Sequence, residues 1–355
     1  MAKQAEHTEN SGHLYWVDMV RVVAVFQVIL VHLAYPVFFK DDLPRTYWYA
    51  ANFYDSLSRM GVPLFFMVSG VLLLRRTEPT GAFLKKRLIK VGVPTIFWSA
   101  FYLWWSVEAY RTGSMTPFRI MLSMLKAIYL GDVEIHLWFL YILIGIYLVV
   151  PILRLLVRAA SRRDLGYFLA MWFISTPLIE LATRATGLPL AFNIPVVAGY
   201  VGYFMMGYFL AEINMTAGKR ALAISGIAIA VVATYFGTNL LSVNVDTIDA
   251  FFYSYFSLPT VLASFCGFLL LKDLGQRQER TCNAVKALSA ESFGIYLIHI
   301  LVIDLLRRGF FGFRLFSWIA PPAYMIPLTA LVVYLVSFGI IFLLRKIPVV
   351  RLLVP

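Results

Sequence analysis

The stretch YWVDMVRVVAVFQVILVHLAYPVFF (residues 15–39) decides the fold class of this chain. It is almost entirely apolar and is long enough to cross the hydrocarbon core of a bilayer as a helix. A helix satisfies its own backbone hydrogen bonds, which lipid cannot do for an open chain. The sequence therefore predicts a membrane-spanning helix here.

Three ionisable residues interrupt this apolar stretch: Asp18, Arg21 and His32. The eleven positions from Arg21 to His32 correspond to three helical turns plus about 20°, so both side chains lie on one face, about 16 Å apart along the axis. Asp18 lies one turn before Arg21 on nearly the same face. Because charged groups inside spans usually face a cavity or a partner, we interpret the stripe as a polar path through the protein. The alternative is that Asp18 pairs with Arg21 and that His32 bonds a neighbouring helix.

The composition extends this interpretation to the whole chain. The 355 residues are 61% hydrophobic and only 14% charged, with a mean hydropathy of +0.78. We expect an all-α, polytopic transmembrane helical bundle of about ten spans: 14–39, 50–74, 91–109, 136–157, 165–183, 194–212, 221–240, 253–271, 292–306 and 322–344. Residues 1–13 and 346–355 would be cytoplasmic tails flanking one membrane domain, 14–345.

The basic residues predict the orientation. With both termini in the cytoplasm, the inner segments hold 20 of the 31 Lys and Arg residues and the outer segments hold nine. The net charge of +12 is thus distributed by topology, which argues against a nucleic-acid partner. Cys266 and Cys282 are expected to be free thiols, and no metal site is expected. The amphipathic stretch 117–130 would be a surface helix or a lid on the outer side.

Further polar candidates follow along the chain. In the second span, Asp55 and Arg59 share one face, whereas Ser69 beside Gly70 suits close helix packing better. Six cations come next, in a predicted cytoplasmic loop 75–90, and could hold the phosphates of a nucleotide cofactor or simply set the orientation: Arg75, Arg76, Lys85, Lys86, Arg87 and Lys90. A structural role suits His136 and His299 better than a catalytic one, so both are only accessory candidates.

The ordered motifs resemble those of the acyltransferase family 3 membrane proteins, which O-acylate surface glycans and related acceptors. The resemblance rests on Arg21 and His32 (the family's Arg-x10-His), PLFFMVSG at 63–70, FLKKRLIKVGVP at 83–94, HLWFL at 136–140 and SFGIYLIH at 292–299. Within the family, the pattern is most similar to members that O-acetylate enterobacterial common antigen. The family's Arg-x-x-Arg is here Arg87 to Lys90, which keeps the charge but loses one guanidinium.

The resemblance implies that His32 is catalytic, with Arg21 as its essential partner, in the cytoplasmic membrane of a bacterium. We expect transfer of an acyl group, with acetyl as the first candidate, from cytoplasmic acyl-CoA to a hydroxyl of a surface or lipid-linked glycan. The six cations would hold the CoA phosphates and the pantetheine arm would pass Arg21 and Arg59, with accessory residues at Asp18, Asp55, Ser69, His136 and His299. The competing interpretation is a transporter or flippase for an anionic solute or a lipid-linked sugar, although the chain shows no internal repeat.

Overall fold

The computed structural model describes residues 14–40, 42–106, 116–188, 197–242, 248–277 and 283–355. Within these ranges every regular element is helical and none is a β-strand. The expected N-terminal tail and Cys282 lie outside the described residues, whereas Cys266 is a buried free thiol. The helices are α1 (Tyr15–Ala34), η1 (Tyr35–Phe39), α2 (Arg45–Ser58), α3 (Gly61–Leu74), α4 (Thr80–Ser106), α6 (Pro117–Leu130), α7 (Trp138–Ala159), α8 (Arg162–Phe173), η2 (Ile174–Leu178), α9 (Ile179–Thr186), α10 (Tyr200–Leu210), α11 (Ala217–Leu241), η3 (Phe251–Tyr253), α12 (Leu258–Arg277), α13 (Asn283–Ala290), α14 (Ser292–Arg308), α15 (Pro322–Leu344) and η4 (Val350–Leu352).

Several helical stretches can cross a membrane, so the chain is a multi-pass membrane protein. By length and composition there are seven among the described residues: Tyr15–Phe39, Arg45–Leu74, Trp138–Ala159, Arg162–Thr186, Ala217–Leu241, Phe251–Arg277 and Pro322–Leu344. The pair α13 and α14, bent by 69°, makes an eighth if it counts as one span. The two further spans expected from sequence correspond to α4 and to α10, of which α10 is only 11 residues long.

The expected cytoplasmic loop 75–90 is wrong, because α4 already begins at Thr80. Four of its cations, Lys85, Lys86, Arg87 and Lys90, therefore lie on the first turns of that helix. The helix begins this early because apolar residues recur at helical spacing through the basic run, and Phe83 among them is fully buried. The cations are consequently held on one rigid element.

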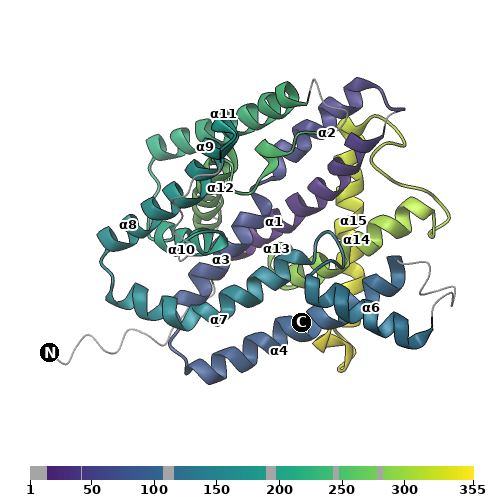
Figure 1. Ribbon diagram of the computed structural model, residues 1–355, viewed down its shortest axis with the longest axis horizontal. Helices are drawn as coiled ribbons and strands as arrows, with labels where there is room; N and C mark the ends of the chain where they lie inside the picture. Colours follow the sequence, from purple (N-terminus) through teal and green to yellow (C-terminus); the bar gives the residue numbers. More distant parts are fainter. Residues whose placement is uncertain (1–13, 41, 107–115, 189–196, 243–247, 278–282) are drawn as a thin grey trace.

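Helix α1 runs through the middle of the bundle (Figure 1). It packs against α2, α3, α12, α13, α14 and α15. Its apolar residues Val20, Val25 and Ile29 are fully buried. In lipid such contacts stabilise a bundle by close packing more than by exclusion of water. The central position of α1 means that its polar residues face other helices.

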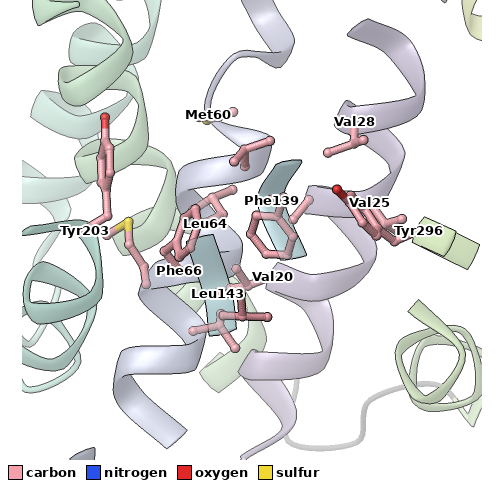
Figure 2. Packing of buried hydrophobic residues seen from close by; sticks show 14 of the residues in the cluster. Val20, Val25, Val28, Met60, Leu64, Phe66, Phe139, Leu143, Tyr203 and Tyr296 are labelled. Carbon is pink, nitrogen blue, oxygen red and sulfur yellow. The ribbon is translucent and has the colours of Figure 1, made fainter. Parts of the chain in front are cut away.

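Helices α3 and α10 approach so closely that only glycine fits at their crossing. A Cβ on Gly70 would lie 1.8 Å from the carbonyl oxygen of Phe204, and a Cβ on Gly207 would lie 2.0 Å from that of Met67. Phe139 of α7 fills the adjoining space beside α1 and α3, with its ring 4.8 Å from that of Phe66 (Figure 2). This crossing fixes α3 against the rest of the bundle.

The second span is broken rather than continuous, since α2 ends at Ser58 and α3 begins at Gly61. Pro63 lies in the first turn of α3, where its missing N–H leaves no hydrogen bond unmade. The break places Arg59 at a helix terminus inside the protein. The C-terminal segment also folds back, because the Trp98 Nε1 donates to the Leu353 carbonyl at 2.9 Å and Val354 is buried.

Candidate active site

A cavity of about 320 Å³ surrounds the end of α1 and contains His32. We call it the histidine cavity. Its polar lining comes from five separate segments of the chain: His32, Ser58, Arg59, His136, Tyr253, Ser254, Tyr255 and Tyr296. No ring nitrogen of His32 has a hydrogen-bond partner among the described residues, so both are available to a ligand in the cavity.

Three histidines lie together here, from α1, α14 and the segment just before α7, and two of them, His32 and His136, line this cavity. The ring centroid of His299 lies 5.2 Å from that of His32 and 5.0 Å from that of His136, while His32 and His136 are 6.3 Å apart. The Nδ1 of His299 lies 2.7 Å from the Tyr296 carbonyl, which only accepts, so Nδ1 carries the hydrogen. His299 Nε2 and His136 Nδ1 are buried without a hydrogen-bond partner among the residues that the structure describes. In the part of the chain that the structure describes, no group of three or more His, Cys, Asp or Glu residues could hold a metal ion.

Arg59 reaches the histidine cavity from the helix break, held by a buried ion pair. Asp55, which is 0% exposed, accepts from Arg59 Nε, while Arg59 Nη1 donates to the Tyr253 carbonyl at 3.1 Å. The guanidinium also lies 4.4 Å from the centre of the Tyr253 ring. The structure thus places Arg59 beside His32 and away from the other expected phosphate-binding cations.

A second cavity, of about 180 Å³, lies toward the other end of α1 and is called the inner cavity. Its charged side chains are all cations, Arg21, Arg87 and Lys90, and Pro355 of the C-terminal segment also lines it. Arg87 Nε is buried there without a hydrogen-bond partner among the described residues. Lys90 precedes the apolar part of α4. Partial desolvation, together with the like charges of Arg87 and Arg21, lowers the pKa of Lys90. An anion in this cavity would relieve both the repulsion and the unmet hydrogen bond.

Of the remaining predicted residues, some lie at or near the inner cavity and others lie at the protein surface. Ser69 lines it but bonds its own helix, donating to the Phe65 carbonyl at 2.8 Å. Asp18 is buried and accepts from Ser289 Oγ at 2.7 Å. Arg75 instead pairs with Glu212 at 3.8 Å. The side chains absent from the cavity lining are exposed at the protein surface: Arg75, Arg76, Lys85 and Lys86.

Tyr296 of α14 separates the two cavities, because its side chain lines both. Its hydroxyl donates to the His136 carbonyl. Its ring lies 5.3 Å from that of Phe139, and both residues are labelled in Figure 2. Tyr296 is therefore the residue that the linings of the two cavities have in common.

A third cavity, of about 360 Å³, also contains His32 and is called the outer cavity. It shares Tyr35 and Ile135 with the histidine cavity but extends along the last turns of α4 and α14. Its other polar and aromatic lining is Tyr102, Trp105, Glu134, Asp304, Arg307, Arg308, Phe316 and Trp318. His32 lies where these two cavities meet.

Helix α14 is the wall common to all three cavities. Ser292 and Phe293 face the inner cavity, and Tyr296 faces the inner and histidine cavities. Six residues face the outer cavity: Ile300, Leu301, Ile303, Asp304, Arg307 and Arg308. Sequence reasoning singled out His299 on this helix and missed Tyr296, which stands in the same motif, SFGIYLIH. It also missed Tyr253 and Tyr255, which no motif marked.

Comparison with known proteins identifies the family. The model of the family 3 acyltransferase domain matches residues 14–346, nearly the whole chain. No curated protein and no solved structure matches. The match spans all the helices that build the three cavities. The chain therefore belongs to acyltransferase family 3 and is a membrane acyltransferase that transfers groups other than aminoacyl groups.

Proposed function

We propose that this protein moves an acyl group, with acetyl as the first candidate, from cytoplasmic acyl-CoA to a hydroxyl of a surface or lipid-linked glycan. It would do so in the cytoplasmic membrane of a bacterium, with both termini on the cytoplasmic side. The motifs that resemble enterobacterial common antigen O-acetyltransferases favour acetyl as the donor group. A reporter enzyme fused to either terminus, active only in the cytoplasm, tests the orientation.

One observation carries the proposal: α1 presents Arg21 to one cavity with cationic side chains and His32 to a second cavity, and Tyr296 lines both. This arrangement suits a donor with an anionic end and a long thin arm. The phosphates would bind Arg21, Arg87 and Lys90, since guanidinium and ammonium groups form charge-assisted hydrogen bonds with phosphate. The arm would pass Tyr296 and bring the thioester to His32.

At the thioester, His32 would act as the general base and Arg59 would stabilise the oxyanion. A neutral His32 accepts the proton of the glycan hydroxyl as that oxygen attacks the carbonyl carbon. Arg59, held by Asp55, stabilises the negative charge that forms on the carbonyl oxygen. The C–S bond then breaks, and the imidazolium of His32 returns the proton to the departing CoA thiolate.

His32 could instead carry the acyl group. Its nitrogen would attack the carbonyl carbon, the CoA thiolate would leave with a proton, and the glycan hydroxyl would then attack the acyl-imidazole. Protein incubated with labelled donor and no acceptor, of which one portion is denatured rapidly at neutral pH and another is kept native for transfer, distinguishes the routes. Label covalently bound to His32 indicates the carrier route, whereas unlabelled protein that remains competent for transfer indicates the general base.

His136 and His299 are proposed as positioning residues for His32. Their rings pack against each other and against the His32 ring, so they limit its rotation. His299→Gln, which can keep a bond to the Tyr296 carbonyl, should retain more activity than His299→Phe at equal protein stability. A kcat that falls while the KM for acyl-CoA stays constant would indicate positioning rather than donor binding.

The decisive experiment supplies labelled acetyl-CoA to inside-out vesicles and follows both CoA release and label in the glycan fraction. His32→Ala should abolish transfer. Arg87→Ala should raise the KM for acetyl-CoA, whereas the matched control Arg76→Ala, an exposed arginine that does not line the inner cavity, should not. Full transfer by His32→Ala contradicts the proposal. Movement of a solute or lipid-linked sugar without CoA release would support the transporter alternative.

A further inference from the structure

The outer cavity also contains His32 but shares no lining residue with the inner cavity. Tyr296, which joins the inner and histidine cavities, does not line it. The Arg307 and Arg308 side chains at its rim are 52% and 48% exposed, so the rim contacts solvent. If the donor reaches His32 past Tyr296, the acceptor of the acyl group can reach His32 through the outer cavity.

Its charged groups are organised around one carboxylate. Asp304 accepts from Trp105 Nε1 at 2.9 Å and from Arg307 at 2.7 Å, and it pairs with Arg308 at 2.6 Å. Each guanidinium contacts Asp304 through one nitrogen, which leaves its other N–H groups for a ligand. The cluster is therefore a preformed set of hydrogen-bond donors.

The charge balance of this cavity differs from that of the inner one. Its lining holds two cations, Arg307 and Arg308, and two carboxylates, Asp304 and Glu134, so the formal charges cancel. The inner cavity holds three cations and no carboxylate side chain. A polyanion is thus favoured by the inner cavity, whereas the outer cavity suits an uncharged ligand rich in hydroxyl groups.

Two tryptophans in the lining, Trp105 and Trp318, indicate which uncharged ligand the outer cavity could bind. Trp105 is oriented by its bond to Asp304 and lies beside Phe101, so its role is to hold the cluster. Trp318 packs against Phe316 with centroids 4.2 Å apart, and the exposed Lys40 ammonium is 5.6 Å from its ring. An indole face attracts the partly positive C–H groups of a sugar ring. The ring hydroxyls can then bond the arginines and the carboxylates.

From these contacts we infer that the outer cavity binds one uncharged pyranose unit of the acceptor, with the sugar ring on Trp318 and its hydroxyls on Arg307, Arg308 and Glu134. One hydroxyl of this unit faces His32. The inference rests on the proposed function for the identity of the acceptor. The binding itself needs no acyl donor.

Saturation-transfer NMR on the full chain in lipid nanodiscs, without acyl-CoA, tests it with methyl glucopyranoside as probe. We expect signal transfer to the pyranoside that exceeds transfer to glycerol and to glucuronate. Trp318→Ala and Arg308→Ala should each reduce it at least fivefold. The matched controls Trp104→Ala and Arg314→Ala change exposed residues outside the cavity lining and should leave it unchanged.

The inference is overturned if the pyranoside receives no more signal than glycerol, or if both cavity variants keep the full signal. Trp318→Phe, which keeps an aromatic face, should retain most of the signal and shows that loss in Trp318→Ala is not a loss of folding. Because no donor is present, the two proposals fail separately. Pyranoside binding without any acyl transfer would contradict the proposed function only, and acyl transfer to a glycan by Trp318→Ala at the wild-type KM would contradict this inference only.

Discussion

Replacing Asp55 with alanine should destabilise the protein, because it leaves the Arg59 guanidinium without its carboxylate. The two side chains are 0% and 10% exposed, so this is a buried ion pair. Removing one partner of such a pair costs about 3–5 kcal/mol. We expect the lower end, about 3 kcal/mol, because Arg59 keeps its bond to the Tyr253 carbonyl and part of its surface faces the histidine cavity.

The double variant Asp55→Leu with Arg59→Met separates charge from packing. Replacing both partners by apolar residues of similar size is often neutral or stabilising, so the double variant should unfold within about 1 kcal/mol of the wild type. It should nevertheless be inactive in acyl transfer, because the cavity has lost its guanidinium. Asp42→Ala is the exposed control. Its carboxylate, 78% exposed and 4.0 Å from Lys40, should contribute less than about 0.5 kcal/mol.

The assay is unfolding of purified protein in mixed micelles by titration with sodium dodecyl sulfate, followed by tryptophan fluorescence, alongside acyl transfer in vesicles. The reasoning is refuted if Asp55→Ala is as stable as Asp42→Ala. It is also refuted if the double variant is as unstable as the single one, because the cost would then come from packing and not from an unpaired charge.

Three further outcomes follow from the same geometry. Tyr296→Ala should join the inner and histidine cavities and raise CoA release in the absence of acceptor, measured by thiol titration, while Tyr296→Phe should stay near the wild type. Gly207→Ala should lower the free energy of unfolding by at least about 1–3 kcal/mol, the cost of overpacking a core, because its Cβ would meet the Met67 carbonyl at the α3–α10 crossing. The same micelle titration measures it. Gly218→Ala, whose Cβ has nothing within 4 Å, is the control, and an equally unchanged curve for Gly207→Ala would contradict the close approach. Lys90→Ala should raise the KM for acetyl-CoA about tenfold, which corresponds to the loss of about one charge-assisted hydrogen bond, whereas Lys90→Arg should leave the KM unchanged. Equal KM values in the two variants would show that Lys90 does not bind the donor.

Much of the fold followed from the sequence because apolar length and helical periodicity are local properties. The stretch 15–39 is helical throughout, and most expected spans have a helix near the predicted bounds. The failure at 75–90 has the same local cause, since an amphipathic helix with a dense basic face was interpreted as a loop. The break between α2 and α3 falls beside Gly61 and Pro63, and a proline is a local signal for a bend, whereas nothing local indicates that Arg59 stands there inside the protein.

By itself the sequence determined that the chain is a helical membrane protein, that Arg21 and His32 share one face of its first span, and that its motifs are those of an acyltransferase. These properties depend on neighbours within a few turns of one helix. Only the tertiary structure brought His136 and His299 to His32, placed Tyr296 in the lining of two cavities and placed Arg87 and Lys90, but not the other four cations, in the lining of the inner cavity. Those arrangements join side chains from helices more than 60 residues apart in the sequence, and the packing that fixes their relative positions has no pattern within any one segment.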